Sequence, residues 1–194
     1  MNGPILIKTY EKLGVDIDQV MRYAGCRGGD NASAELAAQC VTEAEGCFSY
    51  RVCYSLLDCR ICGDICDFGV FSVRSKALSA NLKGCEKVAL FAATVGIGID
   101  RLIGKYSRLS PAKALFFQAI GAQQIETLCD TFCAEIGDNS RPRFSPGYGD
   151  LPLNIQQDIF DILGCEKAIG LTLNSSLLMS PTKSVTAFLG LGSK

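Results

Sequence analysis

The most regular pattern of apolar residues lies in the second half of the chain and predicts one long helix. From Ser110 to Ile136, apolar side chains recur every three or four residues, which is the spacing of one helix face. Ser110 precedes Pro111, a pair typical of a helix start, and Gly137 follows the last apolar position. A helix of this length extends about 40 Å. We therefore expect it to be the central element of the fold.

Shorter elements are predicted on both sides of this helix. One or two short helices are expected over Ile5–Ala24, broken at Gly14. Further helices are predicted over Ala32–Glu45 with Asp30 and Asn31 as its cap, Lys76–Leu82 with Ser75 as its cap, Asp100–Tyr106, and Pro152–Leu163 with Asp150 as its cap. Apolar runs predict strands at Ser49–Leu57, Val70–Val73, Val88–Thr94, Ala168–Leu173, Leu177–Met179 and Ser184–Leu189. The segment Asp58–Phe68 is expected to be a connection.

The order of these elements indicates the fold class. Helices and strands are mixed without the strand–helix–strand rhythm of a parallel sheet. We predict an α+β fold with a mostly antiparallel, twisted sheet backed by helices and one long central helix. The length suits a single domain over residues 1–194.

Composition and charge narrow the classes of partner. Hydrophobic residues make up 48% of the chain and charged residues 20%, so a packed core is expected. The 19 basic and 20 acidic residues give no excess of positive charge for phosphate contacts, so nucleic acid is not an expected partner. No stretch approaches the ~18 unbroken apolar residues of a membrane span, and the first residues lack a basic signal segment. We therefore expect a cytoplasmic protein with no membrane partner.

The chain is rich in cysteine, with 11 Cys and no His. The absence of His excludes catalytic systems and metal sites that need an imidazole. An odd, high count of Cys in a chain without a signal segment argues against a disulfide framework. Because free Cys packs as a small hydrophobe, many of these residues are expected in the core.

The pattern Cys59-x-x-Cys62-x-x-x-Cys66 is the main competing signal. With Cys53 or Cys85 as a fourth ligand, it could hold Zn²⁺ or an iron–sulfur cluster. The spacing matches neither the ferredoxin run nor the two close Cys pairs of zinc sites. We favour structural cysteines and predict no bound metal. A metal or iron–sulfur redox accessory protein remains the alternative function.

A second candidate site is the loop Arg143-Phe144-Ser145-Pro146-Gly147-Tyr148, which follows the long helix. Pro fixes φ and Gly permits positive φ, so a rigid, kinked backbone is expected. Arg offers a bidentate fork for a carboxylate, and Tyr offers a flat face and a hydroxyl. From the residues alone, a Pro-rich connection with a surface Arg is the simpler interpretation, and a site for a small carboxylate-bearing ligand is the functional one.

A family resemblance favours the functional interpretation. The pattern Arg143-x-x-x-Gly147-Tyr148, followed by a short helix and the segment Ile169–Val185, resembles the activation (reactivation) domain of cobalamin-dependent methionine synthase. The resemblance runs from about Val88 to the end of the sequence and is weaker over residues 1–87. It implies that the chain is a stand-alone version of that domain and binds S-adenosylmethionine.

The resemblance also implies which residues bind this ligand: Glu126, Arg143, Ser145, Gly147 and Tyr148. A Glu at about the place of Glu126 helps to bind S-adenosylmethionine in the family, where it would offset the ammonium and sulfonium groups. Arg143 would pair with the carboxylate, and Tyr148 would contact the cation or the adenine. Ser145 and Gly147 would offer backbone groups to the adenosine part. Without the resemblance, Glu126 would be an ordinary exposed helix residue.

The terminal segment supplies further polar residues. In the family a hairpin here lies beside the ligand cleft, so Asn174, Ser175, Ser176, Lys183 and Ser184 are expected near it. Lys183 could face the ligand, but an exposed Lys at a sheet edge is the favoured interpretation.

The implied function is to support reductive reactivation, by remethylation, of the cobalamin of another protein. The chain would be an accessory module of a methyltransferase in methionine biosynthesis. Because it has no His and no corrinoid-binding segment, cobalamin would be supplied by a partner. That partner would be a cobalamin-binding methionine synthase or corrinoid protein lacking this domain, with a flavodoxin-type electron donor. A ligand-binding protein that has lost methyl transfer is a further alternative.

Overall fold

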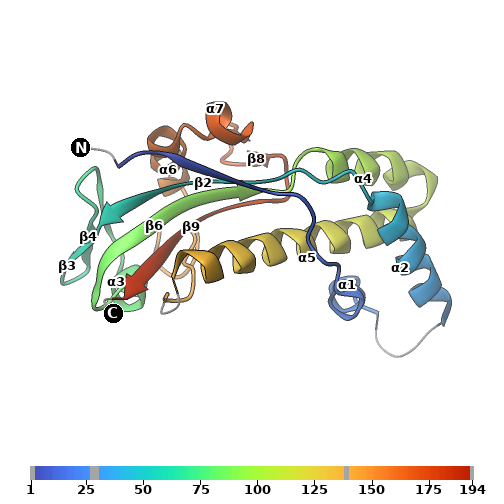
Figure 1. Ribbon diagram of the computed structural model, residues 1–194, viewed down its shortest axis with the longest axis horizontal. Coiled ribbons are helices and arrows are strands. Elements are labelled where there is room, and N and C mark those ends of the chain that lie inside the picture. Colours follow the sequence, from blue (N-terminus) through green and yellow to red (C-terminus); the bar gives the residue numbers. More distant parts are fainter. Residues whose placement is uncertain (1–2, 27–30, 138–139, 193–194) are drawn as a thin grey trace.

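A computed structural model describes residues 3–26, 31–137 and 140–192 of the chain. Its central strands are β1 (Leu6–Tyr10), β2 (Tyr50–Asp58), β6 (Cys85–Thr94) and β9 (Ser184–Gly192). They form a four-stranded sheet in the order β1-β2-β6-β9, with every neighbouring pair antiparallel (Figure 1). The predicted α+β class, with an antiparallel sheet backed by helices, is confirmed.

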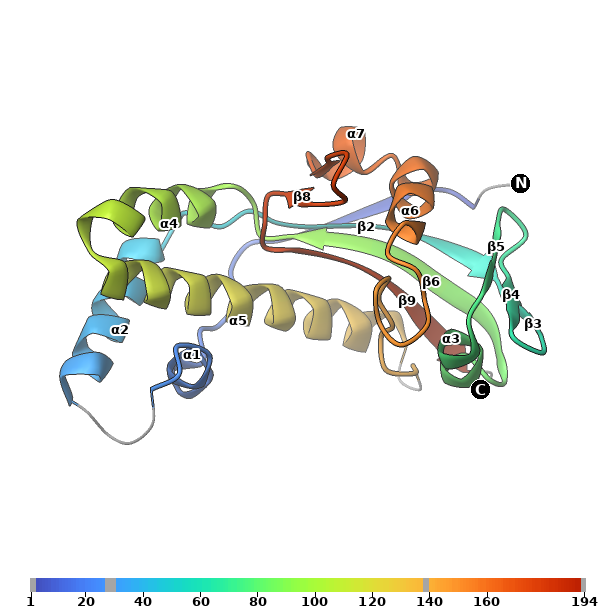
Figure 2. The same ribbon diagram turned by 180° about the vertical axis from the view of Figure 1, so that it is seen from behind.

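Helices cover both faces of this sheet (Figures 1 and 2). On one side are α1 (Ile17–Tyr23), α2 (Asn31–Ala44), α4 (Gly98–Leu109) and α5 (Pro111–Ile136); on the other are α3 (Lys76–Asn81), α6 (Ile155–Leu163) and α7 (Cys165–Ile169). Because successive strand residues point to opposite faces, Phe91 belongs to the core on the α5 side and Leu90 to the core on the α6 side. Burial on both faces explains why β6 is apolar without interruption from Val88 to Ala93.

The long helix α5 is confirmed at both ends. The Ser110 hydroxyl accepts a hydrogen bond from the Lys113 N–H, Pro111 begins the helix, and Gly137 caps its end. Phe132 on its inner face packs against Phe91 of the sheet, with ring centroids 4.9 Å apart. Within the part of the chain that the structure describes, no helix is long and apolar enough to cross a membrane.

The prediction of short helices over Ile5–Ala24 is half wrong. Of the segment predicted as helical, only α1 is a helix, whereas Leu6–Tyr10 forms β1 and pairs in register with residues 50–54 of β2. A short apolar run does not distinguish a helix from a strand by periodicity. The free edge of β2 decides the outcome, because it offers backbone hydrogen bonds that a neighbouring extended chain can satisfy.

Two other segments also differ from expectation. The predicted connection Asp58–Phe68 contains β3 (Arg60–Cys62) and β4 (Ile65–Asp67), which form a small sheet with β5 (Ser72–Arg74). Residues 168–173 are not one strand, since α7 continues to Ile169 and only β7 (Thr172–Leu173) is extended, pairing with β8 (Met179–Ser180). The helix predicted over Ala32–Glu45 is confirmed as α2, while its predicted cap Asp30 lies outside the described residues.

Candidate functional site

The loop between α5 and α6 is anchored to the edge of the central sheet. Phe144 exchanges two backbone hydrogen bonds with Phe188 of β9, at 2.9 and 2.8 Å. Gly147 then turns the chain at φ +88°, a conformation that favours glycine, and its N–H donates to the Leu151 carbonyl. The predicted Arg143–Tyr148 loop is therefore held by backbone hydrogen bonds on both sides.

Asp150 fixes the far end of this loop, in a role different from the predicted one. It does not cap α6, whose N-cap is Asn154. Its carboxylate instead accepts hydrogen bonds from the backbone N–H groups of Lys76 (2.8 Å) and Ala77 (3.1 Å) and from the Ser75 hydroxyl. These bonds lower the pKa of Asp150 to about 2, the hydrogen bond from Ser75 being the largest cause. The loop is thus joined to the start of α3.

Four of the five predicted ligand residues meet in one cleft of about 340 Å³. Glu126 comes from α5, Arg143, Ser145 and Tyr148 come from the loop, and Pro142 and Val185 complete the lining. Gly147 is not among the lining residues, and its place is the turn that presents Tyr148.

Arg143 is bound to two carboxylates of α5. Its two terminal nitrogens donate to Glu126 Oε2 and Asp130 Oδ1. The exposed side-chain fraction is 23% for Arg143, 43% for Glu126 and 70% for Asp130. The two predicted charged residues are therefore paired with each other.

Asp130 is the member of this group that the sequence analysis missed. It lies four residues after Glu126, so both carboxylates project from one face of α5. That spacing is the signal that could have identified it.

The charge of the group is fixed by its environment. Burial by itself lowers the pKa of Arg143, but the hydrogen bond to Asp130 and the nearby negative groups raise it above its ordinary value. The guanidinium therefore stays protonated. Two carboxylates against one guanidinium leave one net negative charge, so the cleft attracts a cationic group.

Tyr148 is the exposed aromatic residue of the cleft. Its exposed fraction is 60%, and its ring contacts Phe144 edge to face with centroids 6.2 Å apart. A ring held on one side and open on the other can accept a flat or cationic group of a ligand.

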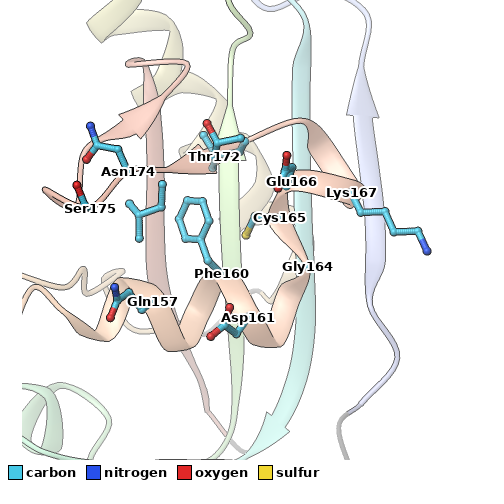
Figure 3. A pocket seen from close by; sticks show the side chains of 12 residues that line it. Gln157, Phe160, Asp161, Gly164, Cys165, Glu166, Lys167, Thr172, Asn174 and Ser175 are labelled. Atoms are coloured by element: carbon cyan, nitrogen blue, oxygen red, sulfur yellow. The ribbon is translucent and has the colours of Figure 1, made fainter.

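A larger cleft of about 840 Å³ lies between α6, α7 and the segment that follows them (Figure 3). Phe160 stands at its centre, with Gln157 and Asp161 along α6 below, while the Lys167 side chain extends away from the others. No ion pair among the described residues involves Asp161, Glu166 or Lys167. Asn174 and Ser175, which the family resemblance placed near the ligand, line this larger cleft and not the one at Arg143.

The three clustered cysteines lie in different environments. Cys59 and Cys66 are buried in the α6-side core, and Cys62 is exposed. Burial raises the pKa of the Cys59 and Cys66 thiols to about 11. Among the described residues, no group of three or more His, Cys, Asp or Glu side chains is arranged to hold a metal ion.

Comparisons with known proteins support the fold. No family model and no curated protein matches the sequence. Among solved structures, the chain is similar to a crystal structure of the MetH reactivation domain bound to AdoHcy, with a TM-score of 0.73 and 14% identity over 100% of this chain and 80% of that one. At this identity the similarity concerns the fold. The fold implied by the sequence resemblance is therefore the one that this chain adopts.

Proposed function

We propose that this protein binds S-adenosylmethionine in the cleft at Arg143 and supports reductive reactivation of the cobalamin of a separate methionine synthase or related corrinoid methyltransferase. One observation carries the proposal: Glu126, Arg143, Ser145 and Tyr148 come together in one cleft. The similarity to a MetH reactivation domain bound to AdoHcy supports it, because AdoHcy is what remains when S-adenosylmethionine donates its methyl group.

The chemistry of the cleft suits this ligand. The net negative charge of Glu126, Asp130 and Arg143 favours the sulfonium and ammonium groups. The open face of Tyr148 suits the adenine or the sulfonium. Arg143 uses two of its five N–H donors on the carboxylates, so others remain for the ligand. The volume of about 340 Å³ lies in the range of small-molecule sites.

The proposed role in catalysis is to position the methyl group. The chain would hold the sulfonium in an open cleft while a partner presents its cobalamin, so the rate gain comes from proximity and orientation. We expect a transient interface of modest area, because the partner must also meet its other substrates. A flavodoxin-type protein or another reductant would supply the electrons.

Two experiments test the proposal in sequence. Isothermal titration of the protein with S-adenosylmethionine should show saturable binding that Glu126→Gln weakens. Addition of the protein, S-adenosylmethionine and a reductant to an oxidised methionine synthase lacking this domain should then convert the cob(II)alamin spectrum to that of methylcobalamin. If the spectral change proceeds equally fast without the protein, the reactivation role is wrong.

A further inference from the structure

The two edges of the central sheet differ in how they are covered. At the β9 edge the chain covers itself, since residues 140–144 form antiparallel bridges with Leu191 and Phe188. At the β1 edge (the blue strand in Figure 1), the only backbone hydrogen bonds that Leu6–Tyr10 makes with described residues are those of its pairing with β2. The other side of β1 therefore presents free N–H and C=O groups, which another extended chain can satisfy.

Neither edge is protected by a free lysine, although an exposed Lys often keeps an edge strand from pairing. Lys8 is the only charged residue of β1, and its ammonium donates to Glu135 of α5 at 2.7 Å. The same carboxylate accepts a hydrogen bond from the Tyr10 hydroxyl at 3.0 Å. At the other edge, Lys183 was expected to be exposed, but it is half-buried and its stem packs against Gly121 of α5. The β1 edge is therefore open and has no unpaired charge on its strand.

Apolar side chains line this open edge. Ile5, Leu6 and Ile7 are consecutive, and their exposed fractions are 45%, 40% and 53%. Ile7 lies opposite Cys53, which belongs to the core on the α6 side. Because alternate residues of a strand share a face, Ile5, Ile7 and the exposed Thr9 form an uncharged row on that side. Folded proteins avoid leaving such an edge uncovered in water, so a second surface is expected to cover it.

We infer that β1 of a second copy of this protein covers this edge, as an antiparallel pair about a two-fold axis at Ile7. Every strand pair of the central sheet is antiparallel, so this pairing joins the two four-stranded sheets into one continuous antiparallel sheet. About this axis, Ile7 meets Ile7 of the second copy, and Ile5 meets its Thr9. The uncharged row is therefore complementary to itself.

The charges beside β1 favour a second copy over a strongly charged partner strand. Lys8 is paired with Glu135, and the two nearest other charges are opposite in sign: Glu11 follows β1 directly, and Arg51 lies opposite Thr9. Two identical surfaces with balanced charge do not repel each other, whereas a strongly acidic or basic strand would find no excess of opposite charge.

The dimer leaves the cleft at Arg143 open. Val185 of β9 lines that cleft, and β9 and β1 are the opposite edges of the sheet. A contact built on a strand of five residues is at the small end of specific interfaces, so we expect monomer and dimer to exchange at micromolar concentrations.

The test places charges at the proposed axis. Sedimentation velocity of the wild type from about 1 to about 100 μM should show a monomer that converts to a dimer. Ile7→Lys and Ile7→Glu each place like charges opposite each other, so each variant alone should dissociate at least about tenfold more readily. An equal mixture of the two variants places Lys opposite Glu and should restore the dimer, which also shows that both variants are folded. The matched control is Leu109→Lys, which changes a residue of 71% exposure at the end of α4 and should dimerise as the wild type does.

The other outcomes overturn the inference. A wild type that stays monomeric over the whole range would reject a second copy as the occupant of the edge. A dimer that both Ile7 variants keep, or that Leu109→Lys loses, would place the contact elsewhere on the molecule. A mixture of the Ile7 variants that stays monomeric would reject the two-fold pairing at Ile7. None of these results depends on whether the protein binds S-adenosylmethionine.

Discussion

The two clefts differ more in what holds their side chains than in their size. The small cleft gathers Glu126, Arg143 and Val185 from a helix, a loop and a strand, and bonds the charged ones to each other. The larger cleft takes all its lining from residues 157–175, and no ion pair among the described residues fixes its charged groups. Volume measures how much space a ligand would have, whereas recognition needs groups already held in position. This comparison favours the smaller cleft as the binding site.

The largest effect is expected from the acidic residue of the small cleft. Under the proposed function, Glu126→Gln would remove the charge that faces the sulfonium, so we expect the affinity for S-adenosylmethionine to fall by about 1.5 kcal/mol, roughly tenfold. Asp161→Asn in the larger cleft is the matched control and should leave the affinity unchanged. Isothermal titration of both variants provides the measurement. A loss for Asp161→Asn and none for Glu126→Gln would place the ligand in the larger cleft.

The small cleft could be predicted from the sequence better than the larger one, because the patterns that indicate it are local. The Ser110-Pro111 start and the helical spacing predicted α5, which carries Glu126. Pro146 and Gly147 predicted the kinked loop. Its neighbour Asp130 followed from a spacing of four residues that was not used. The ligand role itself came from the family resemblance.

The missed features depend on partners distant in sequence. Asp150 stands shortly before α6 in the sequence, which is why it was predicted to cap that helix. The N–H groups that it binds instead belong to Lys76 and Ala77, more than 70 residues earlier. β1 became a strand because β2 offered a free edge. Lys183 was expected to be exposed, and only the contact with Gly121 reveals its packing. No local pattern encodes such contacts.

The aromatic residues of the two clefts give a second matched pair. Tyr148→Leu and Phe160→Leu each remove a ring and keep an apolar side chain. If Tyr148 contacts the cation or the adenine, its loss should cost about 1 kcal/mol of binding, roughly fivefold. Phe160→Leu should leave the affinity unchanged. Equilibrium titration decides between them, and an unchanged affinity in both variants would show that neither ring contributes to binding.

A smaller effect, on stability, is expected from the side chains that anchor the loops of the two clefts. Asp150 joins its loop to α3, whereas the hydrogen bonds that the Asn174 side chain accepts within the described residues come from the Ser176 and Leu178 N–H groups of its own loop. Because the pKa of Asp150 is lowered to about 2, its contribution to stability is present above about pH 4 and is lost as the pH falls toward 2.

Thermal melts between pH 2 and pH 7 test this difference. Asp150→Asn should lower the Tm at neutral pH, and the difference from wild type should shrink below pH 4. Asn174→Ala should lower the Tm by an amount that does not change over this range. A Tm difference for Asp150→Asn that is the same at all pH values would contradict the capping role of its carboxylate.

The smallest effect on ligand affinity is expected at the floor of the larger cleft. Cys165 is buried there, and its hydrogen bond with Cys53 together with burial raises the pKa of its thiol. A protonated, packed thiol contributes to the core and not to chemistry. Cys165→Ala should therefore lower the free energy of unfolding by about 1 kcal/mol, through a small cavity. The affinity for S-adenosylmethionine should not change, which denaturant melts and titration measure on the same sample. If the affinity falls while the stability holds, the ligand reaches the larger cleft, and its greater volume would then have been the better guide to the site.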